Sequence, residues 1–80
     1  MVAGQRIREF RRTEGLSLDG LAELIAQHGV ERPSAAKLSR IETGQPVALD
    51  ILPTLAKITG IPAKELRPDL AELLESGEAA

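Results

Sequence analysis

The sequence contains no cysteine, tryptophan or tyrosine, and Phe10 is its single aromatic residue. The absence of cysteine excludes a disulfide scaffold and a cysteine-based zinc site. The near-absence of aromatic side chains argues against a surface on which the bases of single-stranded nucleic acid stack. It also leaves the core to Leu, Ile, Val and Ala, which favours packed helices over a sheet.

Long apolar segments are also missing. The apolar runs are only a few residues long, and Met1-Val2-Ala3-Gly4 contains no apolar signal region, so we expect a cytoplasmic protein. Eighty residues make one small domain, too short for an enzyme with separate substrate and cofactor lobes. The sequence shows no nucleophile–base pair, cluster of metal ligands or glycine-rich phosphate loop. We therefore predict a non-enzymatic protein without cofactor or metal.

Charge is unevenly distributed along the chain. The formal net charge is −2, whereas a domain that coats DNA is usually basic. Residues 1–45 carry seven basic and six acidic side chains, and residues 46–80 carry three and six, so the two parts contribute +1 and −3. The first part can therefore still present a basic face, while the second part is acidic.

The spacing of apolar residues predicts about five short helices, and hence an all-α, compact bundle. The first helix covers about residues 5–13 and carries four arginines, which form a solvated face unless one or two of them touch phosphate. The second follows Ser17 as N-cap and stops before Gly29. A join over residues 28–33 leads to the third helix and is longer than the turn usual in a helix-turn-helix.

The third helix, residues 34–43, carries the residues that indicate a function most clearly. Ser34 is a good N-cap, and Gly44 can take the left-handed conformation that closes a helix. Ala35, Leu38 and Ile41 recur at helical spacing on its buried side. Ala36, Lys37 and Arg40 point outward. A short helix that buries one side and presents Lys, Arg and small residues on the other suits the major groove of DNA.

The C-terminal part contains a fourth helix and two shorter stretches. The fourth is expected to begin near Asp50 as N-cap, because this places Pro53 in the first turn, where no N–H is needed. A short helix started by Pro62 follows, and then a last helical stretch over residues 69–76. Its apolar face carries four leucines, Leu66, Leu70, Leu73 and Leu74. This face either covers the monomer core or forms a dimer seam, and residues 77–80 should be disordered.

The chain resembles the Cro/C1-type (lambda-repressor-like, XRE) helix-turn-helix family most clearly at Leu38-Ser39-Arg40-Ile41-Glu42-Thr43-Gly44, which fits the family pattern apolar-Ser-Arg-Ile-Glu-x-Gly. It is also similar at Leu21-Ala22 and at Leu55-Ala56-Lys57. A shorter similarity, to YdaS-like regulators, lies around Glu65-Leu66-Arg67-Pro68-Asp69-Leu70. The resemblance implies a lambda-repressor-like domain over residues 4–66, followed by an amphipathic helix at 67–76 and a tail at 77–80.

The resemblance also implies roles for individual residues. The base-reading positions of the family correspond to Ala35, Ala36, Lys37 and Arg40. Its phosphate-contacting positions correspond to Ser34, Thr43 and Gln45, with Arg32 as a further phosphate contact or a third reader. Arg11 and Glu42 match an internal ion pair with a structural role. In this set Lys37 and Arg40 can donate to guanine O6 and N7, whereas alanine offers only methyl contact with thymine.

These observations predict a sequence-specific regulator of transcription, either a repressor or an antitoxin-type autoregulator. It would bind double-stranded DNA as a homodimer with residues 34–43 in the major groove. Leu18 stands where the family often has a phosphate-binding glutamine, so we expect modest affinity that depends on dimerisation or on a larger assembly. The alternative is a protein-interaction module on the same fold, whose acidic, leucine-bearing end docks a toxin or the transcription machinery and which never touches DNA.

Overall fold

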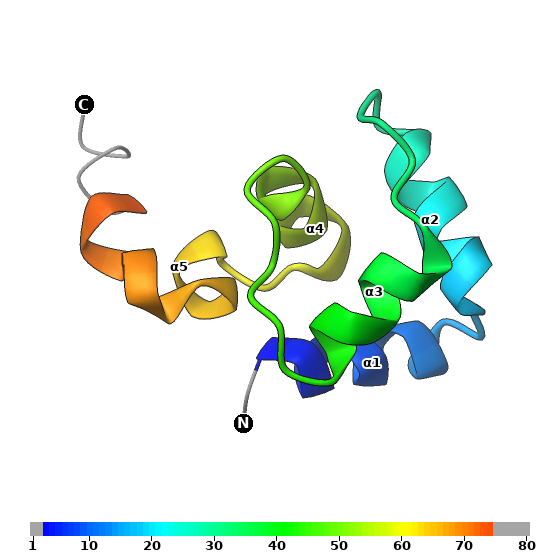
Figure 1. The fold of residues 1–80 in the computed structure, drawn as a ribbon, viewed down its shortest axis with the longest axis horizontal. Coiled ribbons are helices and arrows are strands. Elements are labelled where there is room, and N and C mark those ends of the chain that lie inside the picture. The colour runs from blue at the N-terminus through cyan, green and yellow to red at the C-terminus, as the bar shows by residue number, and fades with distance from the viewer. Residues whose placement is uncertain (1–2, 75–80) are drawn as a thin grey trace.

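The chain is all-α in residues 3–74, the part that the computed structural model describes. Its elements are α1 (Ala3–Thr13), α2 (Leu18–Ala26), α3 (Ala35–Glu42), α4 (Leu52–Thr59), α5 (Ala63–Leu66) and the 3-10 helix η1 (Pro68–Leu70). Residues 71–74 are helical again. α3 packs against α1 and α2, while α5 and η1 lie at the opposite end of the molecule from α2 (Figure 1). The predicted all-α bundle is confirmed.

None of the helices in residues 3–74 has the length and apolar character that crossing a membrane requires.

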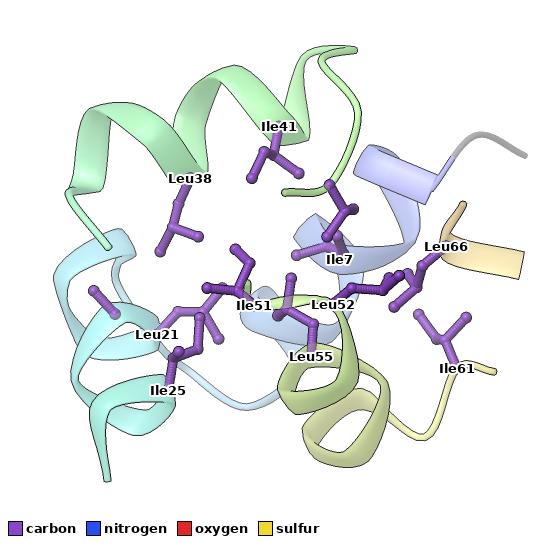
Figure 2. Packing of buried hydrophobic residues seen from close by; sticks show 12 residues of the cluster. Ile7, Leu21, Ile25, Leu38, Ile41, Ile51, Leu52, Leu55, Ile61 and Leu66 are labelled. Carbon is purple, nitrogen blue, oxygen red and sulfur yellow. The ribbon is translucent and has the colours of Figure 1, made fainter. Parts of the chain in front are cut away.

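The bundle is held together by one core of aliphatic side chains. Figure 2 shows Ile7 of α1, Leu21 of α2, Leu38 of α3 and Leu55 of α4 pointing toward a common centre. Each of these side chains is almost fully buried, and burying one contributes about 1.5–3 kcal/mol. Leu38 therefore fixes which side of α3 faces inward.

The starts of α2 and α3, and the end of α3, follow their local sequence. Ser17 accepts a hydrogen bond from the Gly20 N–H at 2.9 Å, so it caps α2 as predicted. Ser34 caps α3 in the same way. α3 closes at Gly44, whose φ of +131° lies in the region that favours glycine. Capping satisfies backbone groups that a helix end leaves without partners, so α3 is defined at both ends.

α4 begins later than the sequence analysis predicts. It starts at Leu52 with Ile51 as N-cap and without a side-chain capping bond, so the prediction of Asp50 as N-cap is wrong. The physical reason is that Asp50 lies in a turn closed by a hydrogen bond from the Ile51 N–H to the Ala48 carbonyl, and its carboxylate pairs with another helix. Pro53 remains within the first turn of α4, where its missing N–H costs little.

The C-terminal leucines do not share one face. Leu66 is only 2% exposed and belongs to the core, so its assignment to a dimer seam is wrong. Leu74 packs partly against the core, whereas Leu73 is 68% exposed. The face is divided because Arg67 adopts an extended conformation before Pro68, which interrupts the helix. The predicted tail at 77–80 and the end of the predicted helix at 67–76 lie outside the described residues.

Arg67 joins this C-terminal segment to the chain that follows α3. Its Nη1 donates to the Val47 carbonyl at 2.7 Å, and its Nε and Nη2 donate to the two carboxylate oxygens of Asp69 at 3.0 and 2.8 Å. These hydrogen bonds hold the pKa of the Asp69 carboxyl below its usual value. A second link, from Arg6 Nη1 to Glu65 Oε1 at 2.7 Å, ties α1 to α5.

Gly4 allows α1 to approach the end of α3 very closely. A methyl group at this position would lie 2.7 Å from the Glu42 carbonyl oxygen and would also meet the carbonyl oxygen of Ile41. Backbone atoms cannot rotate away as a flexible side chain can. Gly4 is therefore required by the packing of the two helices, a role that no pattern within the first helix indicates.

Replacing Gly4 with alanine should lower the free energy of unfolding by about 1–3 kcal/mol, because the added methyl overpacks the contact with α3. This is the reverse of the usual effect in a helix, where alanine is favoured over glycine by about 1 kcal/mol. Urea denaturation followed by circular dichroism measures the change. Gln5→Ala, at the next and exposed position of α1, should have an effect below about 0.5 kcal/mol. A Gly4→Ala protein as stable as wild type would contradict the close approach.

Candidate nucleic-acid interface

The outer face of α3 carries Ala36, Lys37 and Arg40, whereas Ala35, the fourth predicted base-reading residue, lies toward the buried side at the start of the helix. Leu38 and Ile41 bury the inner face, while Ala36 and Arg40 are exposed. Ala35 and Lys37 are partly exposed. This face combines small side chains near the start of the helix with two long cationic side chains further on. Such a surface can come close to a nucleic acid and donate hydrogen bonds to it.

The connection between α2 and α3 is longer than the usual turn between these two helices of a helix-turn-helix. It runs over the eight residues 27–34. The connection is anchored at two points, because Val30 packs against the core and Pro33 is buried directly before the start of α3. Gly29, with φ of +89°, lets the chain turn away from the end of α2. Pro33 thus fixes where α3 begins in spite of the length of the connection.

The three predicted phosphate contacts at the ends of α3 differ in the donors that they have left. Ser34 Oγ accepts from the Lys37 N–H at 3.0 Å, so its hydroxyl hydrogen can still donate to a phosphate. Thr43 Oγ1 instead donates to the carbonyl oxygens of Ser39 and Arg40, both at 3.1 Å. The Gln45 backbone N–H is bound to the Arg40 carbonyl, but its side chain is exposed. Ser34 and Gln45 are therefore better suited to phosphate than Thr43.

A buried ion pair lies where α1 meets the end of α3. Arg11 Nε donates to Glu42 Oε2 at 2.8 Å and Arg11 Nη2 donates to Glu42 Oε1 at 3.0 Å. A third bond, from Arg11 Nη1 to the Leu16 carbonyl at 3.0 Å, reaches the segment that leads into α2. The hydrogen bonds to Glu42 raise the pKa of Arg11 above its usual value. This arrangement fixes three parts of the chain together and has no chemistry of its own.

Arg8 adds a second, more exposed cation beside Glu42. Its Nε lies 3.7 Å from Glu42 Oε1, and about half of its side chain remains accessible. Glu42 already receives two hydrogen bonds from Arg11, so Arg8 leaves the cluster with an excess positive charge at the end of α3. This charge lies at the C-terminal end of the helix, where a cation is favourable.

The cations around the outer face of α3 are not equally available. Arg40 has no side-chain hydrogen bond or ion pair with the rest of residues 3–74. Lys37 Nζ, by contrast, lies 3.5 Å from Asp50 Oδ2. Arg32 lies 3.5 Å from a carboxylate oxygen of Glu23 and 3.9 Å from one of Asp19. The sequence analysis missed these partners. The spacing of Asp19 and Glu23 places two carboxylates on one face of a helix, but it does not indicate which cation lies beside them.

No group of three His, Cys, Asp or Glu side chains that could hold a metal ion occurs within the described part of the chain. A family model described as a helix-turn-helix domain matches residues 2–70, a range that includes α1 to η1. No curated protein and no solved structure matches the chain.

Replacing Arg11 with methionine should lower the free energy of unfolding by about 3 kcal/mol, because the Glu42 carboxylate then stays buried without its main partner. Chemical denaturation followed by circular dichroism gives the value. The double variant Arg11→Met/Glu42→Leu should recover much of the loss, since no charge is left buried.

Arg12→Met is the matched control, because Arg12 is the next residue of α1, is exposed and makes no side-chain bond to the described residues. It should change stability by less than about 0.5 kcal/mol. If Arg11→Met and Arg12→Met were equally stable, the Arg11–Glu42 pair would contribute no more than an exposed ion pair.

Proposed function

Because the chain belongs to the helix-turn-helix domain family, we propose that it is a sequence-specific regulator of transcription of the Cro/C1 type. In this proposal α3 enters the major groove of double-stranded DNA, and α2 lies across the phosphate backbone. The protein acts as a repressor or as an antitoxin-type autoregulator, by occupying a site that the transcription machinery needs. The proposal involves no catalysis, cofactor or metal.

The observation that carries the proposal is the free guanidinium of Arg40 on a helix with defined ends. Arg40 is exposed and makes no side-chain bond to the described residues. A guanidinium has five N–H donors, and its planar edge matches O6 and N7 of guanine. Because the core fixes the inner face of α3, the Arg40 side chain can be held in the groove without reorganising the fold. Arg40 is therefore our first candidate for a base-reading residue.

The other residues of α3 support the same placement. Ala35 and Ala36 have small side chains, which let the start of the helix approach the bases and can contact the methyl group of thymine. Lys37 provides a second cationic reader. Ser34 and Gln45, at the two ends of the helix, provide side-chain donors for phosphate, and such contacts set the register of the protein on the duplex.

We assign the dimer contact to the C-terminal segment. Of the four leucines predicted for it, only those that are not buried in the core can take part. Leu73 is the most exposed of them, and Leu70 and Leu74 are partly buried. A short helix that ends in exposed leucine gains stability when a second copy covers it. Two copies related by a two-fold axis would read two half-sites about one turn of DNA apart.

Replacing Arg40 with alanine should weaken binding to the preferred duplex by about 1–3 kcal/mol, roughly 5- to 150-fold in Kd. Fluorescence polarisation measures the loss, using a labelled duplex selected from a random pool by the wild-type protein. Lys57→Ala is the matched control, since Lys57 is exposed on α4 and its loss removes the same charge. This control should bind almost as tightly as wild type.

The reversal Lys37→Glu/Arg40→Glu provides a stronger test of the same surface and should abolish binding at about 50 mM salt while the helical circular dichroism spectrum is retained. If folded wild-type protein binds no duplex at this salt concentration, the proposal is wrong. The alternative of a protein-interaction module would then take its place.

Replacing Leu73 with lysine should shift a dimer toward monomer, because a charge is introduced on the proposed seam. Analytical ultracentrifugation across a range of protein concentrations measures the dimer dissociation constant, which should rise at least tenfold. Leu49→Lys is the control, since Leu49 is also exposed but lies in the connection between α3 and α4. Equal effects of the two substitutions would contradict the seam.

A further inference from the structure

Two other cations of the proposed DNA surface, Lys37 and Arg32, form exposed ion pairs with carboxylates from other parts of the chain. Lys37 Nζ lies 3.5 Å from Asp50 Oδ2. Arg32 Nη1 lies 3.5 Å from Glu23 Oε2, and its Nη2 lies 3.9 Å from Asp19 Oδ1. These acidic partners come from α2 and from the connection after α3.

Asp50 has no other structural task that would explain its position. It does not cap α4, whose N-cap is Ile51, and its side chain is 62% exposed. Lys37 is the partner that its carboxylate has among the described residues. The position of Asp50 therefore matters for Lys37 rather than for the fold.

An exposed ion pair of this kind is weak and can be exchanged. Such pairs contribute little to stability because water and salt screen them. A carboxylate and a phosphate are alternative acceptors for the same ammonium group. While the Asp50 carboxylate lies beside Lys37, it offsets part of the attraction of that lysine for phosphate. DNA must therefore compete with Asp50 for Lys37.

Resting on the function proposed above, we infer that Asp50 is a positioning residue of the DNA surface and competes with DNA for Lys37. Asp19 and Glu23 do the same for Arg32. In the free protein Arg40 then remains the open cation on the outer face of α3, and binding proceeds by exchange of internal ion pairs for contacts with DNA. The consequence is a low affinity for duplexes that offer only phosphate charge.

The test compares Asp50→Asn with wild type on a fluorescein-labelled duplex of random sequence. Asp50→Asn should bind more tightly at about 50 mM salt, because Lys37 is then free to contact phosphate. Each added phosphate contact steepens the dependence of log K on log salt by about 0.9, so the variant should lose about 3.5-fold more affinity than wild type between about 50 and 200 mM salt. Asp19→Asn/Glu23→Gln should show the same steepening through Arg32.

Glu72→Gln is the matched control. Glu72 is exposed and belongs to the helical residues 71–74, which lie at the end of the molecule away from α2 (Figure 1). The substitution removes the same charge and should leave the salt dependence unchanged. A second comparison uses the Lys37→Gln background, in which Asp50→Asn should no longer steepen the salt dependence. Steepening that persists there would overturn the inference, since Asp50 would then act on DNA directly and not through Lys37.

The outcomes separate this inference from the function on which it rests. If wild type binds its selected duplex and Asp50→Asn behaves like Glu72→Gln on the random duplex, the role of Asp50 is wrong and the proposed function stands. If wild type binds no duplex, selected or random, at about 50 mM salt, the proposed function fails and the inference fails with it.

Discussion

The carboxylate of Glu42 is removed from water where α1 crosses the end of α3, and its charge has to be met at that point. Arg11 meets it with two hydrogen bonds and uses its remaining nitrogen to hold the Leu16 carbonyl. The pair therefore sets how α1, α3 and the entry to α2 lie relative to one another. Gly4 adds to the same constraint, because α1 can come close enough only where it lacks a side chain. The orientation of the outer face of α3 depends on this junction.

Sequence patterns predicted the features whose determinants lie within a turn or two of chain. The caps at Ser17 and Ser34, and the inward direction of Leu38, depend on neighbours three or four residues away. The failures have causes that helical spacing does not show. Asp50 has the right chemistry for an N-cap, but it lies in a turn closed by the Ile51 N–H and the Ala48 carbonyl, and Ile51 is the N-cap instead. Leu66 fits the spacing of the four C-terminal leucines, but its side chain is buried in the core. The outward position of Arg40 could be read from spacing, whereas the acidic partners of Arg32 and Lys37 could not.

Net charge is a poor guide to the surface that this domain presents. The chain carries −2 overall, yet several of its charges cancel locally in ion pairs, among them those of Lys37 and Arg32. Charges separated by more than about 10 Å are largely screened at ordinary salt concentrations. A ligand at the outer face of α3 therefore responds to Arg40 and to the pairs beside it, rather than to the acidic C-terminal part. An acidic protein can in this way keep a local cationic site.

At the two ends of α3, the hydrogen bonds that hold the helix decide which hydroxyl group can still donate to a ligand. A hydroxyl has one hydrogen to donate and can accept as well. Ser34 caps the helix as an acceptor, and so keeps its hydrogen for an anion. Thr43 closes the other end by donating to the carbonyl oxygens of Ser39 and Arg40, so its hydroxyl hydrogen is already used within the protein. Two residues of similar chemistry thus differ in what they can offer DNA, because opposite ends of a helix expose opposite backbone groups. Of the two hydroxyl groups, that of Ser34 is accordingly the better donor to an anion.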